Sequence, residues 1–176
     1  MPSIENKPVA GTDKPIVISI VGRSGAGKTT LLEKLVSWFS GRGLRVGTIK
    51  HSSHSSAGFD QAGKDTWRHG QAGSRHVVLV NSKSFFSRRL LEKEPSLQQV
   101  LDNMPDLDLV FVEGWADQGI NLVEVVSRRT GLEPVNPEEK LVAVISDEPI
   151  KSLKSTMFFR NDINALAEFL QTKLKF

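Results

Sequence analysis

The segment Ile16-Val-Ile-Ser-Ile-Val-Gly-Arg-Ser-Gly-Ala-Gly-Lys-Thr29 decides the fold of this chain. Its first six residues are mostly apolar and β-branched, and they lie between Pro15 and Gly22, which is typical of a short strand covered on both faces. The glycines that follow are typical of a tight loop, and apolar residues then recur at helical spacing as far as Phe39. A strand, a glycine-rich loop and a helix in this order predict an α/β domain.

The loop itself, residues 22–29, fits the pattern G-x-x-x-x-G-K-[ST]. In such a loop, backbone N–H groups surround phosphate oxygens, and the helix adds the positive end of its dipole. Lys28 would place a charge beside the β- and γ-phosphates, and the Thr29 hydroxyl is suited to coordinate Mg²⁺. We therefore expect a nucleoside triphosphate to bind here with Mg²⁺. The residues expected to contact the nucleotide are Gly22, Arg23, Ser24, Gly25, Ala26, Gly27, Lys28, Thr29 and Thr30.

The rest of the chain alternates between strand and helix patterns. Strands are expected at residues 45–49, 77–80, 107–112, 121–127 and 141–145, and residues 84–91 could pair with 77–80 as a hairpin. Helices are expected at residues 65–71, at 96–103 and after Asp162. This alternation predicts an α/β fold with a doubly wound, mostly parallel sheet, of the P-loop NTPase type. We expect a single nucleotide-binding domain over residues 15–176, after a flexible leader at residues 1–14.

The amino-acid composition of the chain excludes several classes of function. The chain has 176 residues, no cysteine and a formal net charge of +3, which suits one soluble α/β domain. The lack of cysteine excludes disulfides and thiolate metal sites, and it fits a reducing compartment. The chain lacks the long run of lysine and arginine that would indicate nucleic-acid binding. No apolar run is long enough to span a bilayer. We expect a cytoplasmic protein that binds neither nucleic acid nor membranes.

A carboxylate near the phosphate loop should complete a magnesium site, since Mg²⁺ prefers oxygen ligands. Glu113 follows the apolar strand expected at residues 107–112, at the carboxyl end where ligands bind in such sheets. Asp108 lies five residues earlier, about 16 Å away along a strand, and should face the opposite edge. We expect Thr29 and Glu113 to bind the metal. Asp60 is a second candidate, for a metal contact through water or for positioning an attacking water.

Residues 50–64 are rich in serine, histidine and glycine, without a regular period, and form a longer connection than most. Long connections of this kind are often functional. Together with basic residues that follow, they suggest a site for a second anionic ligand. Its candidate residues are His51, His54, Lys64, Arg68 and Arg75. Two alternatives remain open: a solvated basic helix face, and a transition metal bound by the two histidines.

A base-recognition residue is harder to find. An aspartate often reads guanine by accepting hydrogen bonds from N1–H and N2–H₂, but no Asn-Lys-x-Asp motif occurs here. Asp147 follows the apolar strand expected at residues 141–145 and is the best-placed substitute. We therefore expect Asp147 to contact the base.

Taken in order, these motifs resemble the MobB family, the GTP-binding accessory proteins of molybdopterin-guanine dinucleotide biosynthesis. The resemblance runs from about Val17 to the C-terminal helix. The segments that resemble the family are Gly22–Thr29, Thr48–His51 with His54, Asp60–Asp65, Gln71–Gly73, Val112–Trp115 and Val144–Asp147.

This resemblance implies a P-loop GTPase fold, a homodimer, GTP bound with Mg²⁺, and slow hydrolysis. It also implies that the chain assists the transferase that attaches GMP to molybdopterin, and that it contacts molybdopterin or its guanine dinucleotide form. The chain would be mainly an adapter, and Asp60 is the sole candidate for a catalytic role. Two other functions remain open. A P-loop small-molecule kinase would need an arginine lid, for which Arg88-Arg89 is the nearest candidate, and a metal-delivery NTPase would use His51 and His54.

Overall fold

The computed structural model describes residues 14–52, 60–116 and 120–176. The chain divides into two compact units. The first contains the described residues up to His51 together with Met104–Phe176, and the second contains those between Ser52 and Asn103. A single nucleotide-binding domain over residues 15–176 stays a prediction. The expected leader lies, except for Lys14, outside the described residues.

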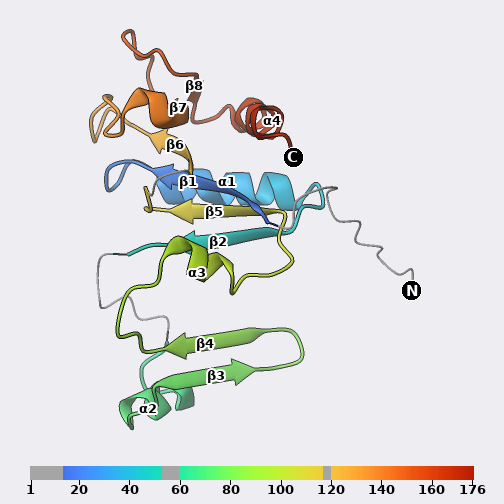
Figure 1. Cartoon of the computed structure of the whole chain (residues 1–176). Coiled ribbons are helices and arrows are strands. Elements are labelled where there is room, and N and C mark those ends of the chain that lie inside the picture. Colours follow the sequence, from blue (N-terminus) through green and yellow to red (C-terminus); the bar gives the residue numbers. More distant parts are fainter. Residues whose placement is uncertain (1–13, 53–59, 117–119) are drawn as a thin grey trace. The chain divides into compact units, whose positions relative to one another are not determined.

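The first unit is built on a six-stranded parallel sheet (Figure 1). Its strands are β1 (Ile16–Val21), β2 (Val46–Lys50), β5 (Leu109–Glu113), β6 (Asn121–Val125), β7 (Leu141–Ser146) and β8 (Met157–Phe159). Their order across the sheet is β2-β5-β1-β6-β7-β8, and every pair is parallel. From β1 the chain adds strands first on one side and then on the other. The doubly wound, mostly parallel sheet of P-loop NTPase type is confirmed.

Two helices of this unit, α1 (Lys28–Ser40) and α4 (Ile163–Leu174), contact each other, and both supply residues to the core. Leu35 and Phe39 of α1 are fully buried, as is Leu170 of α4. The ring of Phe39 lies 5.9 Å from that of Phe111, between ring centroids. Every residue of β5 is buried, as expected for a central parallel strand. A short 3₁₀ helix, η1 (Glu138–Lys140), precedes β7.

The second unit contains α2 (Asp65–Gln71), β3 (His76–Val80), β4 (Phe85–Arg89) and α3 (Leu97–Leu101). The two strands pair in antiparallel fashion, so the expected hairpin is confirmed. Ser96 caps α3: its hydroxyl accepts from the backbone N–H of Gln99, whose side chain accepts from the backbone N–H of Ser96. Among the described helices, none has the length and apolar composition needed to cross a membrane.

Two further differences from the sequence expectations concern the start of α4 and the strand β8. Asp162 is the N-cap residue of α4, but its side chain accepts no capping hydrogen bond. The strand β8 has three residues and no alternating pattern, so its sequence did not predict a strand. It is defined by its pairing with β7 at the edge of the sheet. Such pairing depends on residues far apart in the chain and is not encoded in local spacing.

Candidate functional site

The carboxyl ends of parallel strands meet at one edge of a sheet, and this edge holds most of the candidate site. The phosphate loop, residues 22–29, follows β1 there, and Glu113 ends the neighbouring strand β5. Lys50 ends β2 and is the register partner of Glu113. The backbone N–H of Gly114 donates to the carbonyl of Ile20, at the end of β1.

The loop has the left-handed backbone that its glycines predict. Gly22, Gly25 and Gly27 have φ values of 132°, 73° and 97°. A Cβ atom on Gly22 would lie 2.2 Å from the carbonyl oxygen of Val125 at the end of β6. Glycine is therefore required at position 22 both by its backbone conformation and by close packing.

The Lys28 side chain forms hydrogen bonds with the first residues of this loop. Its Nζ donates to the carbonyl oxygens of Gly22 at 2.9 Å and Arg23 at 3.0 Å. The helix α1 begins at Lys28, and its N-cap residue Gly27 provides no side-chain cap. The first N–H groups of the helix are therefore available to an anion, as they are where helices bind phosphate.

The two predicted magnesium ligands lie together. The Thr29 hydroxyl donates to both carboxylate oxygens of Glu113, at 3.1 and 3.2 Å. Lys50 Nζ lies 3.2 Å from Glu113 Oε1, and the Glu113 side chain is only 10% exposed. A hydroxyl and a carboxylate are hard oxygen donors of the kind that Mg²⁺ binds. Asp108 lies at the other end of β5 as predicted, where it pairs with Arg45 at 2.8 Å.

The third predicted metal residue, Asp60, belongs to the second unit. Its Oδ1 accepts a hydrogen bond of 2.8 Å from the Thr66 hydroxyl, which ties Asp60 to the first turn of α2. Its other oxygen is buried without a partner. A role for Asp60 in metal binding or catalysis stays a prediction.

The residues proposed for a second anionic ligand have separate partners. The ring of His51 lies 4.8 Å from that of Trp115, between centroids, while His54 is outside the described residues. In the second unit, Arg75 pairs with Glu92 at 2.8 Å. These contacts explain part of the sequence pattern without a ligand, and the second anionic site stays a prediction.

The other two basic candidates lie at the start of α2. Lys64 is its N-cap residue, and Arg68 lies 4.0 Å from Asp65 in an exposed pair. Asp65 is the first residue of this helix, and no side chain forms a capping hydrogen bond at its start. Its charge there still interacts favourably with the positive end of the helix dipole.

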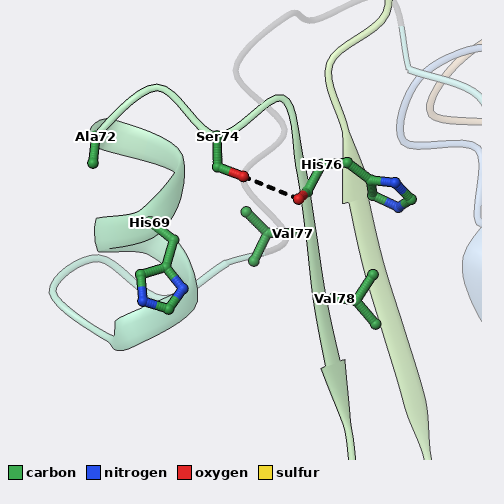
Figure 2. Close-up of a pocket in the computed structure, with 6 residues that line it drawn as sticks. All are labelled: His69, Ala72, Ser74, His76, Val77 and Val78. Atoms are coloured by element: carbon green, nitrogen blue, oxygen red, sulfur yellow. Dashed lines mark hydrogen bonds between the residues drawn. The ribbon is translucent and has the colours of Figure 1, made fainter.

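A shallow pocket of about 420 Å³ lies between α2 and β3 (Figure 2). Its lining residues are His69, Ala72, Ser74, His76, Val77 and Val78. The two imidazole rings do not point toward each other in Figure 2. His76 Nε2 instead forms a 2.7 Å hydrogen bond with the hydroxyl of Ser87. None of the predicted site residues lines this pocket.

Asp147, the predicted base reader, directly follows β7 and is exposed. Its Oδ1 accepts a 2.9 Å hydrogen bond from the backbone N–H of Arg128, which links it to the segment after β6. Contact with a base stays a prediction for Asp147.

Two arginines that the sequence did not single out also contact the phosphate loop. Arg129 Nη2 donates to the carbonyl of Gly25 at 2.8 Å. Arg160 Nη1 lies where a side chain on Gly27 would stand, since a Cβ there would be 2.2 Å from it. Arg160 Nη2 donates to the carbonyl of Val126 at 2.9 Å. Both arginines come from segments that follow other strands of the same sheet edge.

Comparison with known proteins identifies the family of this chain. The family described as "Molybdopterin guanine dinucleotide synthesis protein B", or MobB, matches residues 17–147. The chain belongs to the MobB family.

Individual MobB relatives match over nearly the whole chain. A molybdopterin-guanine dinucleotide biosynthesis adapter protein of Haemophilus influenzae is 35% identical over 162 residues, covering 90% of this chain and 89% of that protein. The protein of the same name from Escherichia coli is 30% identical over 168 residues, covering 92% and 95%. A crystal structure of molybdopterin-guanine biosynthesis protein B has a TM-score of 0.68 at 25% identity, covering 90% of this chain and 99% of that one. These matches do not favour the kinase or the metal-delivery alternative.

Sequence patterns did not predict three side chains of this MobB site, for identifiable reasons. Lys50 directly follows the strand expected at 45–49, so strand register could have placed it beside Glu113. Arg129 follows an expected strand too, but its distance from the strand end gave no reason to choose it. Arg160 follows β8, which was not expected at all.

Proposed function

We propose that this chain is a GTP-binding adapter in molybdopterin-guanine dinucleotide biosynthesis. Its membership of the MobB family supports the pathway, since two relatives carry that adapter name. The contact between the Thr29 hydroxyl and the Glu113 carboxylate, beside a left-handed glycine loop, is the main structural support for nucleotide binding.

In this proposal, the phosphate loop binds the phosphates of GTP through its backbone N–H groups and Lys28. Thr29 and Glu113 hold Mg²⁺, directly or through water, and the metal neutralises charge on the triphosphate. Lys50 pairs with Glu113 and keeps the carboxylate oriented toward Thr29. These residues bind and orient the nucleotide, and in this proposal any hydrolysis of GTP is slow.

Asp147 is the proposed guanine reader. It lies after β7 at the ligand-binding edge of the sheet, and one carboxylate oxygen is already used to hold the segment that contains Arg128. The other oxygen would accept from the base. Replacing Asp147 with Ala should reduce the preference for GTP over ATP, and an unchanged preference would exclude this role.

The partners in this proposal are the transferase that attaches GMP to molybdopterin, and molybdopterin or its guanine dinucleotide form. The adapter name of the two relatives supports partners in this pathway. A cytoplasmic location belongs to the same proposal. The exposed basic side chains Lys64, Arg68 and Arg75 are the candidates for contact with an anionic pterin or with the transferase.

The test is a reconstituted transferase reaction at limiting GTP, with molybdopterin and Mg²⁺, in the presence and absence of this chain. We expect the chain to increase the rate of GMP attachment, and we expect Lys28→Ala to abolish the increase. Lys34→Ala is the matched control, because Lys34 is exposed on α1 and lies outside the phosphate loop. If the wild-type chain has no effect on the rate at any GTP concentration, the adapter proposal is wrong.

A further inference from the structure

Two arginines hold the phosphate loop from outside it. Arg129, in the segment after β6, donates from Nη2 to the carbonyl of Gly25 at 2.8 Å. Arg160 follows β8 and places Nη1 against Gly27, in the space that a side chain would need. Both guanidinium groups therefore lie on the loop residues that precede Lys28.

Arg160 is fixed in place by the protein but is not fully satisfied. Its backbone N–H donates to the carbonyl of Ser146 at 3.2 Å, and its Nη2 donates to the carbonyl of Val126 at 2.9 Å. Its Nε is buried and has no hydrogen-bond partner. A buried donor without a partner is costly, and a further acceptor would remove that cost.

The charge around the loop is also uncompensated. Four basic side chains donate hydrogen bonds to backbone carbonyl oxygens around the loop: Arg23, Lys28, Arg129 and Arg160. In the described part of the chain, none of these four forms a salt bridge. The positive end of the α1 helix dipole also lies at the phosphate loop. Glu113, the nearby acid, is already paired with Lys50. Like charges gathered in this way repel one another, and an anion would relieve the repulsion.

We propose that Arg129 and Arg160 are nucleotide-binding residues, which bind the phosphate chain of the nucleotide held by the loop. This inference rests on the proposed nucleotide site and adds two arginines from the same chain to it. A guanidinium is a planar fork of N–H donors that matches phosphate oxygens, and its charge is retained at any physiological pH. Arg129 is exposed, so its remaining donors are accessible to a ligand.

The competing explanation is purely structural. The same contacts would let the two arginines act only as clamps that keep the loop in its left-handed conformation. A clamp and a ligand-binding arginine differ in their dependence on charge. A clamp affects every ligand of the loop through its shape, whereas a ligand-binding arginine acts on phosphates in proportion to their charge and is screened by salt.

The experiment measures dissociation constants of Mg²⁺·GTP, Mg²⁺·GDP and Mg²⁺·pyrophosphate for wild type and for Arg129→Met, Arg160→Met, Arg129→Lys and Arg160→Lys. Arg128→Met is the matched control, because Arg128 belongs to the same segment but pairs with Glu148 instead of contacting the loop. We expect each Met variant to bind GTP and pyrophosphate about tenfold or more weakly. We expect the Lys variants to recover part of that loss, and the Met variants to show a shallower salt dependence than wild type.

Thermal unfolding of the ligand-free proteins separates folding defects from binding defects. If a Met variant does not fold, the nucleotide affinity of the corresponding Lys variant and the salt dependence of that affinity distinguish phosphate binding from a structural clamp. Met variants that bind GTP within twofold of wild type would overturn the proposal. Equal losses in the Lys and Met variants, with an unchanged salt dependence, would also overturn it and indicate a clamp. A wild-type chain that binds no nucleotide would instead remove the proposed function, and this inference with it.

Discussion

Glu113 stands at the centre of the site, between a hydroxyl and an ammonium group. Thr29 donates to both of its oxygens, and Lys50 pairs with one of them. Replacing Glu113 with Gln should keep its shape but remove the charge that attracts Mg²⁺. We expect the gain in triphosphate affinity on adding Mg²⁺ to fall by about 1.5–3 kcal/mol, the range for hydrogen bonds and contacts of charged groups.

Isothermal titration with and without Mg²⁺ measures this gain. Glu168→Gln is the matched control, because Glu168 is exposed on α4 and has the same charge. If Mg²⁺ strengthens triphosphate binding to Glu113→Gln as much as to wild type, Glu113 is not a metal ligand.

Asp108 lies at the other edge of the same sheet, where its carboxylate pairs with Arg45. The Arg45 guanidinium donates to it at 2.8 and 3.1 Å, and these hydrogen bonds hold the pKa of Asp108 below its ordinary value of 3.8. Because the folded pKa is lower than the unfolded one, the ion pair stabilises the fold at pH values above 3.8. This contribution is lost as the pH falls through the folded pKa.

Asp108→Asn should therefore lower the free energy of unfolding at pH 7 by about 1–2 kcal/mol, a value typical of a partly exposed charged hydrogen-bonded pair. The difference from wild type should shrink as the pH falls below 3.8, where the wild-type carboxyl also becomes neutral. Urea unfolding at several pH values checks this. A difference that is constant with pH would mean that the charge of Asp108 does not stabilise the fold.

At the scale of elements, the contact between the phosphate loop and β6 is the feature most sensitive to substitution. A Cβ on Gly22 would lie 2.2 Å from the Val125 carbonyl oxygen, whereas one on Gly43 would meet nothing within 4 Å. Both glycines have positive φ, at 132° and 88°. Gly22→Ala therefore adds a clash to the backbone strain that both substitutions share.

We expect Gly43→Ala to cost about 1 kcal/mol of unfolding free energy, and Gly22→Ala clearly more, with loss of nucleotide binding. Thermal unfolding and a nucleotide titration on the two variants check this. Equal destabilisation of both would show that the loop does not depend on close packing against β6.

The sequence predicted the elements that depend on local pattern and missed those that depend on distant pairing. The strand, loop and helix of residues 16–40 were predicted closely because hydrophobic period and glycine spacing are local. Glu113 was found since a buried strand led directly to it. Arg160 was missed because β8 exists only through its pairing with β7. Local pattern therefore predicts the loop but not the arginines around it.

At the scale of the whole molecule, the resemblance to the MobB family implies a homodimer, and we propose the hairpin of β3 and β4 (Figure 1) as its interface. The residues Val80 and Phe85, which are register partners, are 67% and 69% exposed. A two-stranded sheet is marginally stable alone, and strand edges that lack partners favour pairing with another chain. Exposed apolar residues on such a hairpin suggest that a second copy covers it.

Val80→Ser with Phe85→Ser should therefore convert a dimer to a monomer, which analytical ultracentrifugation measures. Val135→Ser is the control, because Val135 is 60% exposed in the first unit. A wild-type monomer would contradict the homodimer proposal. A dimer that survives the double substitution would show that the interface lies elsewhere.

The most direct test of the nucleotide-binding adapter is a titration of wild type and Lys28→Ala with GTP and with ATP, each with Mg²⁺. We expect wild type to bind Mg²⁺·GTP more tightly than Mg²⁺·ATP, and Lys28→Ala to lose most of that affinity because the phosphates lose their charged partner. Equal binding of the two nucleotides would contradict guanine recognition, and no binding of either would contradict the account as a whole.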